Sequence, residues 1–136
     1  MANTLKLEIV TPEARIYSAD ADMVTLPAIE GEMGVYPQHV PLMTQVVTGE
    51  IAVKSEGKEH YFAVGDGFVE VTGSHVTILS DMAVNVDDID EAAAEAARQR
   101  ATARLQEKLN DEEAALVTAA LAHSLAQLHV KRRHKR

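Results

Sequence analysis

The chain is predicted to fold as an all-β N-terminal antiparallel sandwich of about ten short strands, followed by a C-terminal antiparallel hairpin of two helices. Three observations predict this class. Short β-branched runs alternate with turn residues up to about residue 86, alanine-rich sequence follows Asp87 and Asp88, and neither glycine nor proline occurs after Gly73. We therefore expect two domains, residues 1–86 and 87–136.

Eight segments of the first domain have the β-branched content of strands, and several alternate apolar with polar residues. They are residues 5–10, 23–26, 42–47, 51–54, 61–64, 68–71, 76–79 and 82–86. Turn signals, such as Gly65 with Gly67 and Gly73 with Ser74, recur along the domain. A spacing of about ten residues between turns is typical of antiparallel hairpins in a sandwich or barrel.

Residues 26–42 lie between two of these strands and are rich in residues that restrict or bend the backbone. Pro27, Pro37 and Pro41 each fix φ and remove a donor, whereas Gly31 and Gly34 permit turns that other residues resist. We expect this segment to be a rigid, exposed loop that suits recognition.

The second domain is predicted to form two helices, because 13 of the 21 alanines lie between Ala92 and Ala126. Asp88, with Glu91 three residues later, predicts a capping box at the first helix, and Asn110 before Glu113 repeats the pattern at the second. The stripes expected to face each other are Ala93, Ala97, Ala101, Leu105 and Leu109 on the first helix and Val117, Leu121, Leu125 and Leu128 on the second.

An alanine ridge lets helices approach closely but buries less apolar surface than leucine does. We therefore expect a hairpin that folds but docks weakly on the sandwich, and that can detach and extend as a mechanical switch requires. A hairpin that simply stays folded is the competing interpretation.

Charge and composition exclude several classes of function. The net charge is −8, and it divides into about −10 for residues 1–88 and +2 for residues 89–136, which argues against a nucleic-acid platform in the first domain. The basic tail at residues 131–136 is suited to an acidic surface or is simply solvated. There is no cysteine, and no apolar run has the length of a signal peptide or membrane span, so we expect a soluble, cytoplasmic protein.

No constellation of catalytic residues stands out. The six histidines lack metal-ligand spacing, and the sequence contains neither a phosphate-binding loop nor a nucleophile elbow. Glu30 and Glu32 flank Gly31 and raise the possibility of a paired-carboxylate enzyme, but an exposed turn favours a solvated loop instead. With 4% aromatic residues and no tryptophan, a base-stacking surface is not expected. We expect a protein that is not catalytic by itself.

Several fragments, in their order and spacing, resemble the epsilon subunit of F-type proton-translocating ATP synthases. They are LEIVTPE near the start, LPAIEGEMGVYPQHVPLMT, VVTGEI, GFVEV with VTILSD after it, and IDEAAAEAA at the first helix. The resemblance covers essentially the whole chain. A free-standing adaptor that binds an unrelated partner is the alternative from another functional class.

The resemblance implies a non-catalytic subunit of the rotating central stalk, which couples proton flow to ATP synthesis. In such proteins the sandwich grips the gamma subunit and rests on the membrane ring of c subunits. Glu32 would lie toward the polar loops of the c-ring, and His39, in a motif with Tyr36 and Pro37, would lie toward gamma. Gln38 stands where relatives often have glycine, and we expect it to alter the local turn geometry.

The resemblance also implies a regulatory role for the helices. In bacterial relatives the hairpin folds against the sandwich or extends along gamma into the alpha/beta catalytic hexamer, where it opposes ATP hydrolysis. Lys131, Arg132 and Arg133 would then meet acidic segments of the catalytic subunits. The implied location is peripheral, on the cytoplasmic face of the bacterial cell membrane, without direct insertion into the bilayer.

Some relatives bind ATP through a motif of the form Ile/Leu-Asp-x-x-Arg-Ala. In this sequence the matching stretch starts at Ile89 and Asp90, and Ala93 replaces the arginine, which removes a bidentate phosphate contact. Arg98, Arg100 and Arg104 are the cations that would have to compensate for it. We therefore expect no cofactor, with Ile89, Asp90, Arg98 and Arg100 as weak ATP candidates.

Overall fold

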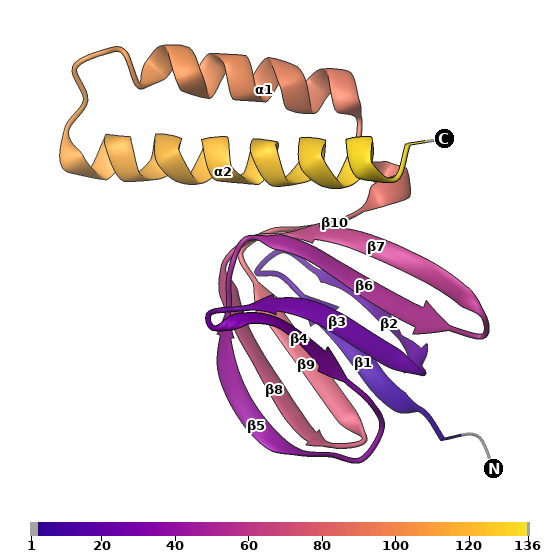
Figure 1. Ribbon diagram of the computed structural model, residues 1–136. Helices are drawn as coiled ribbons and strands as arrows, with labels where there is room; N and C mark the ends of the chain where they lie inside the picture. Colours follow the sequence, from indigo (N-terminus) through magenta and orange to yellow (C-terminus); the bar gives the residue numbers. More distant parts are fainter. Residues whose placement is uncertain (1–2, 136) are drawn as a thin grey trace.

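The computed structural model describes residues 3–135, in which a ten-stranded sandwich carries a two-helix hairpin at one end (Figure 1). Residues 1, 2 and 136 belong to the predicted domains but lie outside the described residues. The strands are β1 (Leu5–Val10), β2 (Arg15–Ala21), β3 (Met23–Ala28), β4 (Gly31–Val35), β5 (His39–Val46), β6 (Gly49–Ser55), β7 (Lys58–Val64), β8 (Gly67–Gly73), β9 (His75–Ser80) and β10 (Ala83–Asn85).

The strands follow the order β10-β7-β6-β3-β5-β8-β9-β1-β2, and β4 pairs with β3 beside this path. The sheet folds over into two layers (Figure 1). The sandwich prediction is confirmed, with one departure from the antiparallel expectation: β1 pairs with β9 in parallel. Strands that a tight turn joins must pair antiparallel, but β1 and β9 are far apart in sequence and can pair in parallel.

The core of the sandwich follows from the alternation of apolar residues. In β1, the side chains of Leu5, Leu7 and Ile9 are buried, while the residues between them are partly exposed. Phe62 of β7 lies in the same core, and the ring of Tyr17 meets it edge-on at 5.0 Å between centroids. A continuous apolar interior therefore fixes the register of the strands.

The expectation of an exposed loop at residues 26–42 is wrong, because most of this segment is paired. Pro27 lies within β3 opposite Glu32 of β4, and Gly31, with φ of 123°, closes the turn between the two strands. The sequence analysis also missed β2, a mainly exposed edge strand with polar residues at many positions. In β3 and β4, proline and glycine suggested that the strands are interrupted, but pairing with neighbouring strands accommodates both residue types.

Two helices follow the sandwich, α1 (Glu91–Arg104) and α2 (Asp111–Arg133), after a short 3₁₀ turn η1 (Val86–Asp88). The capping box of Asn110 and Glu113 is confirmed. The predicted N-cap Asp88 is wrong, because it lies in η1; Asp90 caps α1 instead and accepts from the Ala93 amide at 3.0 Å. Neither helix of the described residues is long and apolar enough to cross a membrane.

The facing stripes of the helices are only partly as predicted. Ala101 and Leu128 are buried, but Ala93, Leu105 and Leu125 are exposed. The buried helix residues are Ala94, Ala101, Ser124, Ala126, Leu128 and Val130. Alanines occur on all sides of α1, so the positions of the alanines do not identify the buried face of this helix. Helix α2 lies between α1 and the sandwich, so it buries two faces instead of one (Figure 1).

Candidate functional site

The segment of β4 and the turn after it carries most of the predicted contact residues, which are all partly or fully exposed. Glu32 lies near the start of β4, whereas Tyr36, Pro37 and His39 lie at its other end and beyond. Four residues of extended strand separate Glu32 from Tyr36, or about 13 Å. The structure therefore does not gather these residues into one site but places them at two ends of the same strand.

Gln38 adopts a strained backbone conformation in the turn between β4 and β5. Its φ is 65°, in the left-handed region that favours glycine. A proline followed by a residue with positive φ is typical of a type II turn. Pro37 therefore sets the turn, and Gln38 takes the conformation that a glycine would adopt, at a cost of about 1 kcal/mol.

Exposed apolar side chains lie along β5, β8 and β9, from Val40 next to this turn to Phe68 and Leu79 toward the other end of β8 and β9, and we call them the apolar strip. It consists of Val40 and Met43 on β5, Phe68 on β8 and Leu79 on β9. Phe68 and Leu79 are direct neighbours across the β8–β9 pair and are 57% and 51% exposed. Large apolar side chains that are exposed together mark a surface for another molecule.

The sequence analysis missed the apolar strip as a binding surface. It placed Phe68 and Leu79 in strands, but their exposure depends on which face of each strand turns outward. The signal was present in the alternation of β8, where Val69 and Val71 are buried and Phe68 shares the outward face with Glu70. Phe68 and Val69 are adjacent apolar residues, and successive residues of a strand point to opposite faces of the sheet. Such a pair indicates that the outer face of the sheet is apolar here as well as the inner face.

The hairpin docks on the sandwich through a small apolar cluster that is separate from the main core. Its buried members are Ala63 of β7, Ile89 after η1 and Val130 of α2. Tyr61, Met82, Val84 and Val86 pack around them. Three buried side chains form a small contact compared with the sandwich core.

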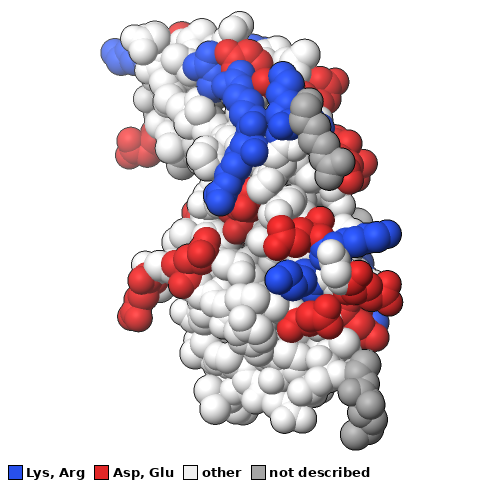
Figure 2. Space-filling view, turned by 45° about the vertical axis from the view of Figure 1, so that its right-hand side comes forward, with Lys and Arg blue, Asp and Glu red and all other residues white. Residues whose placement is uncertain are grey.

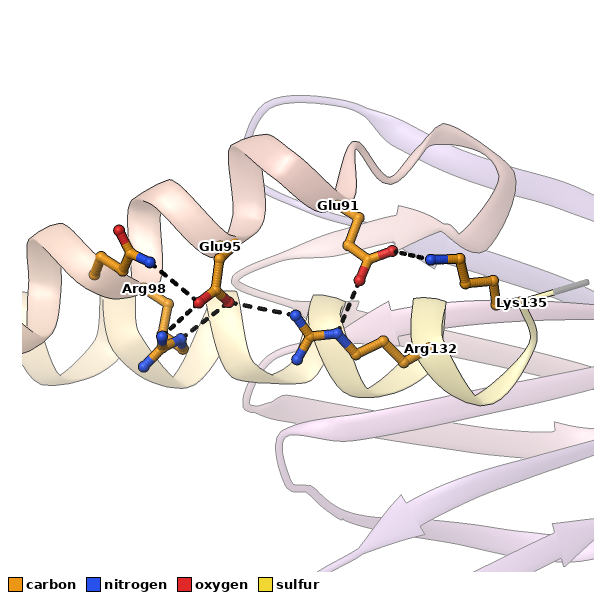
Figure 3. Close-up of polar contacts among 6 residues, drawn as sticks. Glu91, Glu95, Arg98, Arg132 and Lys135 are labelled. Carbon is orange, nitrogen blue, oxygen red and sulfur yellow. Dashed lines mark hydrogen bonds and ion pairs between the residues drawn. The ribbon is translucent and has the colours of Figure 1, made fainter.

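Ion pairs join the C-terminal end of α2 to the start of α1 (Figure 3). The Arg132 guanidinium lies 2.8 Å from Glu91 and 3.5 Å from Glu95, and Lys135 lies 3.2 Å from Glu91. Arg98 also donates to Glu95, so that Glu95 is shared between two guanidinium groups. Lysines and arginines gather over the hairpin at the top of Figure 2, with carboxylates among them.

These cations lower the pKa values of both carboxyls. Hydrogen bonds from Arg98 are the main cause that brings the pKa of Glu95 to about 2. Hydrogen bonds from Arg132 and Lys135 lower the pKa of Glu91 below its ordinary value. The two glutamates therefore remain charged at all physiological pH values and hold the ends of the helices together.

A second set of contacts ties the same end of α2 to the sandwich. Glu50 of β6 lies 2.8 Å from His134 and 3.7 Å from Arg133, and Tyr61 stacks on the His134 ring at 3.5 Å between centroids. The Lys131 ammonium donates to the carbonyl of Val86 at 3.1 Å. In this folded arrangement the predicted partner-binding cations Lys131, Arg132 and Arg133 all have partners within the chain.

The ATP candidates do not form a common site. Ile89 is buried in the docking cluster, Asp90 caps α1, and Arg98 is paired with Glu95. Arg100 is exposed on α1, as is Ala93, which stands where the resemblance places an arginine. The residues of the motif thus serve the helix start and the docking of the hairpin.

Comparisons with known proteins agree with this architecture. Residues 4–86 match the family model for the beta-sandwich domain of the ATP synthase delta/epsilon chain, and residues 87–132 match the model for its long alpha-helix domain. The chain is 41% identical to the ATP synthase epsilon chain of Laribacter hongkongensis over 93% of this chain and 91% of that one. It is also 41% identical to the ATP synthase epsilon chain of Alkalilimnicola ehrlichii over 98% and 96%.

A solved structure has the same fold. A chain of the Euglena gracilis mitochondrial ATP synthase, a complex of OSCP, F1 and c-ring, superposes with a TM-score of 0.74 at 23% identity, over 93% of this chain and 80% of that chain. The family models together match almost the whole length of the described chain, from the first strand to the end of α2. This chain therefore belongs to the ATP synthase delta/epsilon chain family.

Proposed function

We propose that this chain is a non-catalytic rotor subunit in the central stalk of an F-type ATP synthase, where it helps to couple proton flow to the synthesis of ATP from ADP and phosphate. Family membership supports this role, and the observation that carries it is the apolar strip. An exposed surface of this kind suits a subunit that is permanently bound to a partner.

The partner at the apolar strip is the gamma subunit in this proposal. Val40, Met43, Phe68 and Leu79 supply the apolar contacts. Tyr36, Pro37, Gln38 and His39 lie at the β4–β5 turn, next to the Val40 end of the strip. His39 is fixed at this edge, since its Nδ1 lies 2.8 Å from the carbonyl oxygen of Val40. A rigid turn beside an apolar patch gives both affinity and register to a docked helix or strand.

Glu32 serves a different contact in this proposal. It is exposed at the opposite end of β4 from Tyr36, and it would face the polar loops of the c-ring. One surface would then hold gamma while another rests on the ring. The chain would lie at the cytoplasmic face of the bacterial cell membrane as a peripheral part of the complex.

Residues 87–136 form the regulatory domain in this proposal. When the hairpin leaves the sandwich, Lys131 loses the carbonyl of Val86 and Arg133 loses Glu50. When the two helices also separate and extend, Arg132 loses Glu91, and all three cations become free to pair with acidic segments of the alpha/beta hexamer. Such contacts would oppose rotation in the direction of hydrolysis. The small docking cluster supports this movement, because few buried side chains must separate.

No cofactor is part of this proposal. Ala93 leaves α1 without the guanidinium that would bind a phosphate, and Arg98 is already held by Glu95. Calorimetric titration of the isolated chain with ATP is expected to give no heat of specific binding. Millimolar or tighter affinity would contradict this part of the proposal.

Co-purification tests the proposed function. The full chain, expressed with its own ATP synthase subunits, is expected to form a stable complex with a long coiled-coil gamma subunit. Phe68→Asp is expected to abolish the complex without unfolding the sandwich, because the side chain is 57% exposed. Lys54→Gln, at an exposed site on β6 away from the apolar strip, is the control. A chain that binds no gamma subunit, or a Phe68→Asp variant that binds it normally, would refute the proposal.

A further inference from the structure

The two ends of the helical hairpin are held together in different ways (Figure 1). At one end the chain itself connects the helices, because α1 ends at Arg104 and α2 begins at Asp111. At the other end the start of α1 lies beside the last turns of α2, and no stretch of chain joins them directly. We call this the open end of the hairpin. The helices separate here unless contacts between side chains prevent it.

Apolar packing between the helices is small on the side of α1. The buried residues of this helix are Ala94 and Ala101. An alanine side chain buries a single methyl group, and burial of apolar surface is what stabilises most helix pairs. Polar contacts at the open end therefore account for a larger share of the stability of this hairpin than they would in a leucine-rich one.

Charged side chains connect the helices at the open end, two carboxylates of α1 and two cations at the end of α2 (Figure 3). Nε of Arg132 lies 2.8 Å from Oε2 of Glu91, and Nη2 of Arg132 lies 3.5 Å from Oε2 of Glu95. Nζ of Lys135, just after the helix, lies 3.2 Å from Oε1 of Glu91. Hydrogen bonds from Arg132 and Lys135 lower the pKa of Glu91. Arg132 therefore bridges the two carboxylates, and Glu91 accepts from two cations.

Helix α1 positions both carboxylates for this contact. Glu91 and Glu95 are four residues apart, so their side chains lie on the same face of the helix. Glu95 is also held from within its own helix, because the side chains of Arg98 and Gln99 both donate to it. The pair of carboxylates is therefore presented to the end of α2 in a fixed arrangement.

The cations that contact α1 are not those that contact the sandwich. Arg132 and Lys135 are three residues apart and both reach the carboxylates of α1. The neighbouring cations Lys131 and Arg133 make their contacts with η1 and β6 instead. The contacts that dock α2 on the sandwich and the contacts that hold it to α1 are therefore made by different side chains, and different substitutions break them.

We propose that Glu91, Glu95, Arg132 and Lys135 form an electrostatic clasp, an autoinhibitory contact that must break before the helices separate at the open end. While the clasp is closed, carboxylates of the chain itself occupy the two cations, which are then not available to an acidic surface of another molecule. Dissolved ions screen partly exposed charges, since the Debye length is about 10 Å at 0.1 M salt and about 3 Å at 1 M. The clasp therefore weakens as the salt concentration rises.

The size of the effect follows from the contacts that cross between the helices. A partly exposed ion pair changes an equilibrium by about two- to fivefold. Arg132 and Lys135 each form such a pair with α1. Loss of both cations is therefore expected to change the opening constant of the hairpin by roughly tenfold at low salt. In about 1 M salt the same loss is expected to change it less than about twofold.

Native-state hydrogen exchange of the isolated full chain tests the clasp, because it measures rare separation of the helices even when the folded hairpin predominates. The amides of residues 95–104 report on α1, which packs mainly against α2. Exchange is measured at one pH in about 0.05 M and about 1 M sodium chloride and is corrected for the effect of salt on the intrinsic rates. Arg132→Gln with Lys135→Gln leaves the sequence of α1 unaltered. This double variant is expected to raise the opening constant of α1 roughly tenfold at low salt and less than about twofold at high salt.

Two further variants assign the effect to the clasp. Lys54→Gln with Lys58→Gln is the matched control, because it removes the same charge from exposed sites beside the β6–β7 turn, and it is expected to leave the opening constant within about twofold. Arg132→Lys keeps the positive charge and is expected to retain most of the clasp. A double variant of Arg132 and Lys135 whose α1 opens like that of the unaltered chain at low salt, or whose effect is equally large at high salt, would overturn the proposal.

The consequence for ATP hydrolysis rests on the proposed function, but the clasp itself does not, because the exchange experiment needs no partner. Glu91→Gln with Glu95→Gln opens the clasp and leaves Arg132 and Lys135 free, so it is expected to strengthen the inhibition of hydrolysis in the assembled complex. If α1 responds as expected in the isolated chain while this variant leaves hydrolysis unchanged, the clasp stands and the proposed regulation fails. If α1 does not respond, the clasp fails and the rotor role is unaffected.

Discussion

Val130 is the residue through which the docking of the hairpin is most directly tested. It is 1% exposed and packs in the cluster with Ala63 of β7 and Ile89. Val130→Ala removes two methyl groups from this contact. At about 0.8 kcal/mol for each buried methyl, with a further contribution from the cavity that is left, the variant should lose about 2 kcal/mol of docking free energy.

A loss of about 2 kcal/mol corresponds to an opening constant about 30-fold larger. Native-state hydrogen exchange of the α2 amides measures this change, and the amides of β1 and β9 serve as an internal reference because the sandwich core does not contain Val130. Leu116→Ala is the control variant, since Leu116 is 69% exposed near the far end of the same helix. The control is expected to change the opening constant less than twofold.

If Val130→Ala leaves the exchange of α2 unchanged, or if α2 and the sandwich lose protection equally, the hairpin does not open as a separate unit. The account of a weakly docked regulatory domain would then be wrong, although the fold would stand.

Three further changes are expected to have defined effects. Gln38→Gly relieves the left-handed backbone at φ 65° and should stabilise the sandwich by about 1 kcal/mol, measured by urea unfolding; destabilisation would show that the side chain contributes more than the strain costs. Gly67→Ala places a Cβ 1.8 Å from the carbonyl oxygen of Leu79 and should lower the free energy of unfolding by about 1–3 kcal/mol; an unchanged melting temperature would refute this close contact. The lowered pKa of Glu95 means that its stabilising contribution is present above pH 4.5 and is lost as pH falls toward about 2. Helicity measured by circular dichroism should therefore decrease over that range in the unaltered chain and less so in Glu95→Gln, and identical pH profiles would contradict the role of the Arg98 pair.

The sequence predicts the division into sandwich and hairpin well, because alternation and alanine content are local signals. Leu5, Leu7 and Ile9 mark β1 by their spacing, and Asn110 with Glu113 marks the start of α2 by its capping chemistry. It fails for β4, where Gly31 and Gly34 suggest a loop although the strand is held by pairing with β3. Pairing partners that are distant in sequence, such as β1 and β9, leave no local pattern.

The candidate site was predictable only where a local sequence signal exists. Proline and glycine mark the β4–β5 turn itself, whereas its contact residues Tyr36, Pro37, Gln38 and His39 are predictions that come from the family resemblance. The ion pairs of Glu50 with Arg133 and His134 join residues more than 80 positions apart, and no periodicity indicates them. Asp88 was preferred as the N-cap because Glu91 follows it by three positions, but Asp88 lies in the 3₁₀ turn, and Asp90 caps the helix that begins at Glu91.

In the proposed function this chain is a rotor subunit whose helices regulate hydrolysis. The most direct test compares ATP hydrolysis by the reconstituted complex containing the full chain with hydrolysis by a complex containing residues 1–87 alone. The truncated chain is expected to assemble with gamma through the apolar strip, and hydrolysis is expected to be faster without the hairpin. Assembly with unchanged hydrolysis would contradict the regulatory role of the helices.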